Sequence, residues 1–496
     1  MASNFGKAKT MCASRDAQCA HRVSRRRVIT ALLVTLSCSM FVAATHAAQW
    51  AKGYSGAGND SLSSVFPTAD GGFIAAGDTN SFGAGDHDAW VLKLDAGGNV
   101  VWQRTYGGAA ADFATSVKPT GDGGYVVGGY TTTATGVSGF VVRLDAGGNV
   151  TWQRSFAADS VVNAVEIASD GGHVLAGRVG SNAWTAKLDA IGNIMWQKTY
   201  NDSLCCASLW AAESIQGTTD GGYILTGSTF FRFSDAWVVK LDAAGSVVWA
   251  RSFNGFRGIS VLARPATGGG YVVAGSLFDV SPNSGFNAML TKLDESGGIT
   301  WSKSYFGERL FSWTTVSSVD ATPNGGYVTT GTVPNPNGVP PDPPAVTKFD
   351  ANGNISWVRT FGTNFSGFQD IRSTPDGGYI VAASTLSNDT RSTEASLLKL
   401  GVDGNILGCA GIGTATLSTG AGYGSGSLTP AVSTTGVANV TGSLTTGTSA
   451  ATVSEPCNAS NATVTPVPML SNKVIILLAV LLAACGAWAW HFRRTG

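Results

Sequence analysis

Polar and apolar residues alternate along most of this chain with a period of two, which is the pattern of half-buried β-strands. Runs of β-forming residues, such as YVVGGYT and FVVRLD, are separated by short clusters of Gly, Asn and Asp. Such clusters between strand-like runs predict β-hairpins. No long helical pattern interrupts the region between residues 50 and 407. The pattern therefore predicts an all-β fold.

The strand pattern is organised as a long repeat that can be aligned on tryptophan. The phrase KLDAGGNVVWQRTYGG at residues 93–108 is a clear copy, and every tryptophan of the series begins W-x-[KR]-x-[YF]. Successive copies are spaced by 52, 50, 44, 53, 52 and 56 residues. Such periods indicate a solenoid or a propeller. We expect seven structural tryptophans that pack between units: Trp50, Trp102, Trp152, Trp196, Trp249, Trp301 and Trp357.

Seven units of four short antiparallel strands would close into a seven-bladed β-propeller. The array begins with a lone strand at residues 49–54 and ends at residues 397–407 without a complete W-strand. We therefore expect the N-terminal strand to complete the last blade by pairing with residues 397–400. An open solenoid would need capping units, and neither end of the array supplies one.

Two kinds of carboxylate recur with the repeat, in the Asp-Gly-Gly corners and in the turns that precede each W-strand. They could bind a series of calcium ions, but they are not spaced as closely along the chain as the oxygen ligands of a calcium-binding loop. Aspartate caps backbone N–H groups in such turns, so we expect a structural role. His173 stands where other units have Phe or Tyr and predicts a packed ring. His87, between Asp86 and Asp88, predicts a solvated loop or a small cation site.

Both ends of the chain indicate export. Arginines at residues 25–27 precede an apolar run to about residue 44, and Thr45-His46-Ala47 fits a small-x-small cleavage site. This run is shorter than the ~20 residues of a membrane span. We expect a signal peptide cleaved before Ala48, and the motif SRRRVI leaves both general and twin-arginine export open.

At the other end, residues 474–490 are uncharged and are followed by His491-Phe492-Arg493-Arg494. An apolar run that ends in aromatic and basic residues predicts a transmembrane helix. Residues 464–496 resemble bacterial C-terminal sorting tails of the IPTL/PEP-CTERM kind, with the motif PVPML where such tails usually show Ile-Pro-Thr-Leu. The resemblance implies a bacterial envelope location and a sorting peptidase as partner. Whether the tail is retained or cleaved stays open.

Between the repeat and this tail, residues 408–465 are rich in Ser, Thr and Gly and almost free of charge. They predict a flexible stalk, or a small β module stapled by a Cys409–Cys457 disulfide. Cys205 and Cys206 would then form a vicinal disulfide or stay as thiols. The predicted domains are a signal peptide at 1–47, the propeller at 48–407, the stalk or module at 408–465, and a sorting motif, transmembrane helix and basic end at 466–496.

Composition narrows the possible functions. The 496 residues include 32 Lys and Arg against 32 Asp and Glu, and only 13% are charged. Such a chain lacks the basic surface that nucleic acids require, so we expect no nucleic-acid partner. The sequence has no G-x-S-x-G, H-E-x-x-H or phosphate-loop motif. We therefore assign no catalytic residue, cofactor or metal ligand.

The loops hold the candidate binding residues. The short hairpins should share one face of the propeller, so the long, unequal loops gather on the other. Aromatic and arginine side chains, which recognition surfaces favour, concentrate there in units three to five. Packing between blades is the other role open to them. The candidates for ligand binding are Trp210, Phe231, Phe233, Arg257, Arg309, Phe311 and Trp313.

The phrase L-D-x-x-G-x-x-x-W resembles the tryptophan-docking motif of quinoprotein-type propellers. The whole region 50–407 resembles secreted bacterial seven-repeat propellers of the quinoprotein-like or kelch-like kind. The resemblance implies the fold, without implying quinone binding. We expect an exported, membrane-anchored protein that presents a non-catalytic binding surface to a surface glycan, a matrix polymer or a protein. The alternative is a polysaccharide lyase, a hydrolase or a quinone-dependent dehydrogenase with its site over the propeller axis.

These two functions predict different surfaces on the long-loop face. An enzyme would bring two or more carboxylate, histidine or arginine side chains together at the axis, because catalysis needs converging chemical groups. A binding protein would present an exposed aromatic patch.

Overall fold

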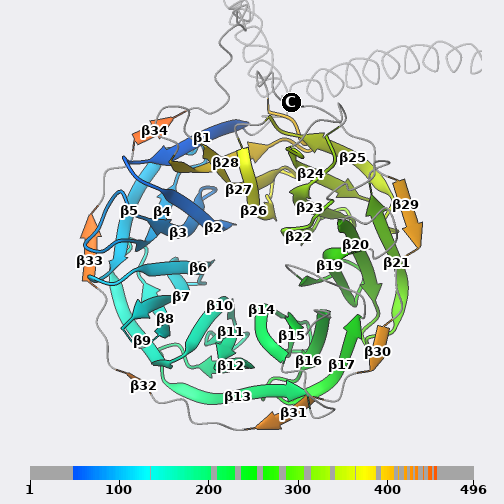
Figure 1. Cartoon of the computed structure of the whole chain (residues 1–496), viewed down its shortest axis with the longest axis horizontal. Helices are drawn as coiled ribbons and strands as arrows, with labels where there is room; N and C mark the ends of the chain where they lie inside the picture. Colours follow the sequence, from blue (N-terminus) through cyan, green and yellow to red (C-terminus); the bar gives the residue numbers. More distant parts are fainter. Residues whose placement is uncertain are drawn as a thin grey trace, which may run out of the picture. The chain divides into compact units, whose positions relative to one another are not determined.

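Seven β-sheets surround a common axis in the computed structural model of this chain (Figure 1). The structure describes residues 48–454 except residues 135, 203–208, 230–235, 254–260, 279–285, 307–313, 336–340, 363–364, 387–391, 407–411, 413–417, 422–424, 428–429, 434–438, 441–444 and 449–451. Within these described ranges no helix is long and apolar enough to span a bilayer. The predicted signal peptide, transmembrane helix and all four cysteines of the exported part lie outside the described residues.

Each sheet is one blade, and its strands follow one another from the axis outward. The strands of blades one to four are β2 (Asp60–Pro67), β3 (Phe73–Thr79), β4 (Asp88–Leu94) and β5 (Val100–Gly107); β6 (Asp112–Pro119), β7 (Tyr125–Thr133), β8 (Gly136–Leu144) and β9 (Val150–Ala158); β10 (Ser160–Ile167), β11 (His173–Val179), β12 (Asn182–Leu188) and β13 (Ile194–Asp202); and β14 (Leu209–Gly217), β15 (Tyr223–Thr229), β16 (Ala236–Leu241) and β17 (Val247–Phe253).

The strands of blades five to seven are β18 (Val261–Pro265), β19 (Tyr271–Phe278), β20 (Phe286–Leu293) and β21 (Ile299–Phe306); β22 (Ser318–Ala321), β23 (Tyr327–Thr332), β24 (Pro344–Phe349) and β25 (Ile355–Thr360); and β26 (Phe365–Ser373), β27 (Tyr379–Leu386), β28 (Thr393–Leu400) and β1 (Trp50–Ser55). All neighbouring strands within a blade are antiparallel, as the hairpin pattern predicts.

The N-terminal strand β1 closes the ring. It pairs with β28 in a register that joins Trp50 to Lys399, Ala51 to Leu398 and Lys52 to Leu397. The strand at the start of the array therefore becomes the fourth strand of blade seven. This confirms the predicted all-β, seven-bladed propeller and the way it closes.

The repeated W-x-[KR]-x-[YF] phrase ties each blade to the next. The indole Nε1–H of Trp102 in β5 donates to the carbonyl oxygen of Ala146 at 3.0 Å, in the hairpin turn of the following blade. The Tyr106 hydroxyl donates to the carbonyl oxygen of Gly148 at 2.7 Å in the same turn. Trp50 and Tyr54 make the equivalent bonds from blade seven to blade one.

The glycine of each outer turn lies beneath the tryptophan of the preceding blade. Gly148 has a φ of +80°, a conformation that residues with a Cβ rarely adopt. A Cβ at this position would also lie only 2.9–3.1 Å from the nearest ring atoms of Trp102. Both constraints recur in the other blades, which explains why the glycine and the tryptophan repeat together.

The repeated aspartates cap these turns, as expected. Asp145 Oδ1 accepts the backbone N–H groups of Gly147 and Asn149, while its Oδ2 accepts the Asn149 side-chain amide. Hydrogen bonds from Asn149 lower the pKa of Asp145. The Asp-Gly-Gly corners add an ion pair within the blade, as between Asp70 and Lys93 at 2.8 Å.

The apolar core is divided among the spaces between neighbouring blades. Val91 and Tyr106 of blade one pack in one cluster with Val117, Val127 and Phe140 of blade two. Comparable clusters of buried side chains join the other blades. Every interface of the ring therefore depends on side chains from two units, which fixes the inner strands around the axis.

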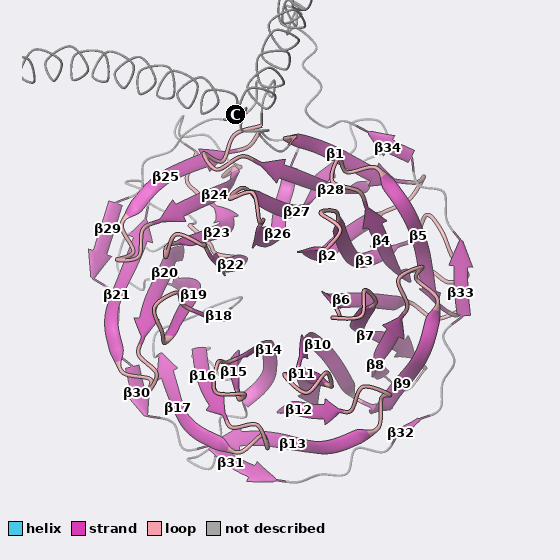
Figure 2. Cartoon of the chain, turned by 180° about the vertical axis from the view of Figure 1, so that it is seen from behind, coloured by secondary structure: helices cyan, strands magenta, loops and turns pink. Residues whose placement is uncertain are grey.

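Six short strands in residues 418–454 lie outside the propeller, and we call them the belt: β29 (Ser418–Ala421), β30 (Ser425–Ser427), β31 (Pro430–Ser433), β32 (Asn439–Val440), β33 (Thr445–Thr448) and β34 (Thr452–Ser454). They pair antiparallel with β21, β17, β13, β9, β5 and β1 in that order. Figure 2 shows them around the outer strands.

The belt differs from both the free stalk and the separate β module expected for residues 408–465. The outermost strand of a blade presents unpaired backbone N–H and C=O groups. A small, uncharged segment can pair with such edges through its main chain alone, whichever residues it contains. In the described residues, blade six is the one sheet of four strands, and its edge strand β25 has no belt strand.

Candidate functional site

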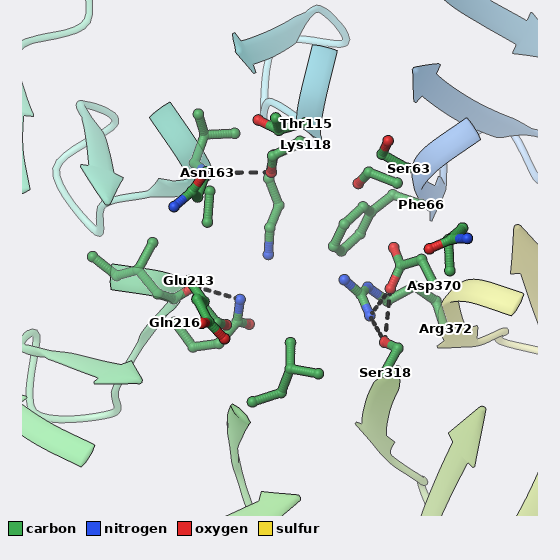
Figure 3. Close-up of a pocket in the computed structure, with 18 of the residues that line it drawn as sticks. Ser63, Phe66, Thr115, Lys118, Asn163, Glu213, Gln216, Ser318, Asp370 and Arg372 are labelled. Atoms are coloured by element: carbon green, nitrogen blue, oxygen red, sulfur yellow. Dashed lines mark hydrogen bonds and ion pairs between the residues drawn. The ribbon is translucent and has the colours of Figure 1, made fainter. Parts of the chain in front are cut away.

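A cavity of about 150 Å³ lies on the propeller axis and takes lining residues from all seven blades (Figure 3). All but Ser317, which directly precedes β22, come from the innermost strands, in the parts that lead into the Asp-Gly-Gly hairpins. We call this space the axial cavity. Its lining residues are Ser63, Ser64, Phe66, Thr115, Ser116, Lys118, Asn163, Ala164, Val165, Glu213, Ser214, Ile215, Gln216, Leu262, Arg264, Ser317, Ser318, Gln369, Asp370 and Arg372.

A recurring β-bulge supplies part of this lining. In β2 the pairing register shifts between Leu62 and Ser64, so Ser63 is the extra residue. Bulges redirect side chains and are common beside functional sites. Four other inner strands have a bulge at the equivalent place, and its extra residue also lines the cavity: Thr115, Asn163, Glu213 and Gln369.

A second set of side chains occupies one equivalent position in every inner strand, four residues before the Asp-Gly-Gly corner or its equivalent. We call this set the axial ring. Its members are Phe66, Lys118, Glu166, Gln216, Arg264, Asp320 and Arg372. Five of the seven line the cavity directly. The scaffold therefore presents a different side chain from each blade around one axis.

Two cations of the axial ring are paired with carboxylates. Lys118 Nζ lies 2.9 Å from Glu166 Oε2, and Arg372 Nη1 lies 2.7 Å from Asp370 Oδ1. Both cations also approach the ring of Phe66, at 4.4 Å for Lys118 and 4.3 Å for Arg372. Phe66 thus lies close to two cations that share the cavity (Figure 3). Burial lowers the pKa of Lys118.

The two carboxylates that line the cavity are held by the scaffold. Glu213 accepts the hydroxyl of Ser228 at 2.7 Å and the backbone N–H of Val261 at 3.2 Å. Asp370 accepts the hydroxyl of Ser318 at 2.9 Å, besides backbone N–H groups. Burial raises the pKa of Glu213. These contacts fix both carboxylates in place.

His87 lies in a separate cluster on the long-loop face. Its Nδ1 is 2.8 Å from Asp78 Oδ2, and its ring stacks on Phe113 with centroids 5.3 Å apart. Phe113 stacks in turn on Tyr130 at 5.0 Å. Among the described residues, no group of three or more His, Cys, Asp or Glu side chains is placed to hold a metal ion.

The structure does not bring the candidate binding residues together in its described part. Trp210 belongs to strand β14, whose range is given above, and its side chain is not described. The other six candidates lie outside the described residues: Phe231, Phe233, Arg257, Arg309, Phe311 and Trp313. An aromatic patch on the long-loop face therefore stays a prediction.

Sequence reasoning missed the axial residues, although a signal for them exists. The seven units can be aligned on the Asp-Gly-Gly corner. The residue four positions before this corner is then Phe, Lys, Glu, Gln, Arg, Asp and Arg in units one to seven. Scaffold positions keep one residue type, whereas this one changes charge. The charged groups do converge at the axis, but near its hairpin end and not on the long-loop face considered for an enzyme.

Comparisons with known proteins do not assign a family. No protein-family model matches the sequence, and no curated protein matches it either. Solved structures with a similar fold include Sqt1 of Chaetomium thermophilum, which has 11% sequence identity and a TM-score of 0.42, with 69% of this chain and 96% of that chain covered.

Two enzymes are also among the similar structures. The polysaccharide lyase Uly1 has 10% identity and a TM-score of 0.41, with 69% of this chain and 90% of that chain covered. The GH93 α-L-arabinofuranosidase of Fusarium graminearum, solved with arabinobiose, has 10% identity and a TM-score of 0.41, with coverages of 71% and 98%. We base no functional argument on these likenesses, because they extend only to the fold.

Proposed function

We propose that this chain is an exported, surface-anchored propeller that binds a glycan or matrix polymer without catalysing a reaction on it. The observation that carries the proposal is the way in which the charged side chains of the axial cavity are hydrogen-bonded and paired. Its two lining carboxylates accept hydrogen bonds from scaffold groups, and two of its three cations are paired. Side chains fixed in this way form a preorganised polar surface, which suits recognition of a ligand because little freedom is lost on binding.

The long-loop face supplies the second part of the proposal. The aromatic and arginine candidates there would contact the polymer over a wide surface, while the axial cavity, near the hairpin end of the axis, would be a separate site for a small group. Export and anchoring rest on the signal-like N-terminus and the apolar C-terminal segment. A protein ligand is the other partner class that such a surface could serve.

A capture experiment tests this function. The full chain, purified in detergent and immobilised, is expected to retain an acidic polysaccharide and release it unchanged in length. Trp313→Ala and Phe231→Ala should each weaken capture several-fold, because aromatic anchors carry much of the energy of recognition. Val101→Ala is the matched control, since Val101 is 61% exposed on an outer strand away from the loops. Retention of no polysaccharide or protein by the full chain would contradict the proposal.

Catalysis is the second candidate, and Glu213 is the observation that favours it. Burial raises the pKa of this carboxyl, and burial shifts the carboxyls of general acids in the same direction. If the captured polysaccharide is shortened, Glu213→Gln should abolish the cleavage and leave the capture intact.

A further inference from the structure

Arg264 is a buried cation without a carboxylate partner. It lies on β18, lines the axial cavity and is 5% exposed. Its Nη1 donates to Ser214 Oγ and to the carbonyl oxygen of Ala263, both at 3.1 Å. Among the described residues it belongs to no ion pair. Burying an unpaired charge is strongly unfavourable, as the destabilisation on removing one partner of a buried ion pair shows.

The surroundings of Arg264 increase this cost. Lys118 and Arg372 line the same cavity, so three cations share a space of about 150 Å³. Burial, together with the positive charge of Arg372, lowers the pKa of Arg264 to about 10, although the charges of Asp320, Asp370 and Glu166 act in the opposite direction. The guanidinium therefore remains charged at neutral pH while it lies in a site that disfavours positive charge.

None of the nearby carboxylates that the structure describes forms an ion pair with Arg264. Glu166 is paired with Lys118, and Asp370 is paired with Arg372. Asp320 of the axial ring accepts the backbone N–H of Ser373 at 2.8 Å. Glu213 accepts its two donors from Ser228 and Val261. Each carboxylate thus has partners of its own, and Arg264 forms an ion pair with none of them, although the charges of Asp320, Asp370 and Glu166 partly offset the cost of its burial.

The remaining wall of the cavity suits an oxygen-rich guest. It is lined by polar side chains that include Ser63 and Gln369. The amides of Asn163 and Gln216 each donate one N–H to a backbone carbonyl and keep a second N–H for a guest, whereas the Thr115 hydroxyl already donates to Val162. A cavity of this volume accepts one small group and excludes a polymer chain. A guanidinium binds carboxylate, sulfate and phosphate through two parallel N–H donors, which a single ammonium cannot do.

We propose that the axial cavity binds one oxyanion group, a carboxylate, sulfate or phosphate, with Arg264 as its principal partner. Lys118 and Arg372 lie around it and supply further positive charge. The inference rests on the proposed function in one respect, that the propeller binds ligands, and it names the chemistry of the group that enters the cavity.

Binding of small anions to the full chain tests the proposal directly. Isothermal titration with sodium glucuronate, sulfate and inorganic phosphate, at constant ionic strength in chloride, should give saturable binding of at least one anion. Glucose should give none, because it lacks the charge. The anion with the highest affinity identifies the source of the oxyanion. If none of the three binds, the proposal is wrong.

Substitution of Arg264 locates the site. Arg264→Gln should weaken anion binding at least tenfold, whereas Arg178→Gln should leave it unchanged. Arg178 is the matched control because it is paired with Asp159 at 3.1 Å and lies outside the cavity. Equal affinity in the Arg264→Gln and wild-type proteins would overturn the assignment.

Two further measurements keep the test decisive. If Arg264→Gln does not fold, Arg264→Lys retains the charge and removes the two-pronged geometry, and it should still lower affinity. Failure of this inference is also distinct from failure of the proposed function. A protein that captures a polysaccharide but binds none of the small anions refutes the oxyanion site alone. A protein that binds anions but captures nothing supports the site and refutes the display function.

Discussion

At the scale of single residues, His173 makes the stability of blade three sensitive to acid. It occupies the slot that Phe73 or a tyrosine fills elsewhere, packs against Trp152 and is 1% exposed. Burial lowers its pKa to about 4 from the ordinary 6.5. Below pH 6.5 the unfolded chain therefore binds a proton that the folded chain rejects, and stability falls as the pH drops toward 4.

His173→Phe should remove this dependence, because phenylalanine fills the same slot without titrating. We expect His173 alone to cost the wild-type protein about 2 kcal/mol between pH 7 and pH 4.5. Urea unfolding of both proteins at the two pH values measures the difference. If the wild-type protein and the variant lose the same stability on acidification, burial of a neutral histidine does not govern this effect.

Glu213 should make anion binding depend on pH. Its pKa is raised by burial, so it is neutral at low pH and adds a negative charge to the cavity as the pH rises through that pKa. Lys118, whose pKa is lowered by burial, loses charge in the same direction. The affinity for sulfate, which stays ionised throughout, should therefore fall when the pH is raised from acidic to alkaline values.

Glu213→Gln isolates the contribution of the carboxyl, because glutamine has nearly the same shape and does not titrate. Titrations with sulfate across this pH range should show a flatter profile for the variant. Identical profiles would assign the pH dependence to the cations alone.

Whether the role of a residue could be predicted from the sequence depends on how often that residue recurs among the seven units. Trp102 and Gly148 recur in every unit, so repetition alone predicted their structural role. Arg264 and Glu213 each occur once at their place in the ring, and only closure of the blades brings them together. A single sequence contains the variation but does not state which strand position faces the axis.

At the scale of secondary-structure elements, the belt should stabilise the propeller from outside. It supplies backbone partners to the outer strands of six blades. A chain that ends at residue 412 lacks the belt, and we expect it to fold with its free energy of unfolding lowered by a few kcal/mol. Each net hydrogen bond contributes about 1 kcal/mol, less the entropy of ordering the segment.

A chain that ends at residue 454 is the matched control, since it keeps the belt and lacks the tail. Thermal unfolding and amide hydrogen exchange should distinguish the two, with faster exchange in the outer strands of the shorter chain. Equal stability and equal exchange would indicate that residues 418–454 form a stalk, as their composition suggested.

Composition could not predict the belt. Strands are recognised by alternating, β-forming residues with a buried face. The belt strands contain two to four residues each and are rich in Ser, Thr and Gly, such as Ser425–Ser427. They resemble a linker because their pairing depends on the open edges of the blades, which a local sequence pattern does not reveal.

At the scale of the whole molecule, closure depends on β1 more than on any other outer strand. The equivalent strand of the other blades is covalently joined to its neighbour by a short hairpin. β1 reaches blade seven only through pairing and packing, so it separates without the high effective concentration that a hairpin provides. The indole of Trp50 donates to Ala96 of blade one and so helps to hold β1.

Trp50→Ala should therefore destabilise the protein more than Trp249→Ala, which removes the equivalent side chain from a hairpin-joined strand. A buried tryptophan costs about 3–5 kcal/mol when it is truncated, and the Trp50 variant should lie at or above that range. Chemical unfolding of both variants provides the comparison. Equal losses would contradict the prediction, because Trp50 is also the more deeply buried of the two indoles.

The architecture of the ring was predictable because seven units and an incomplete last blade define it. The position of Trp50 at the start of the array and the lack of a W-strand after residue 400 together required the closing pair. The two ends of the chain, outside the repeat, contain only local sequence patterns. Their export and anchoring functions depend on cellular partners and remain predictions.

The order in which the belt pairs with the blades has a mechanical consequence. Its last strand, β34 (Thr452–Ser454), lies on β1, and its earlier strands lie on blades one to five. A pulling force applied through the residues beyond 454 would reach β34 first. The belt strands would then separate one after another, each extending the chain and dissipating work before the load reached the ring. A propeller tethered in this way could withstand shear at a surface while its axial cavity kept its shape.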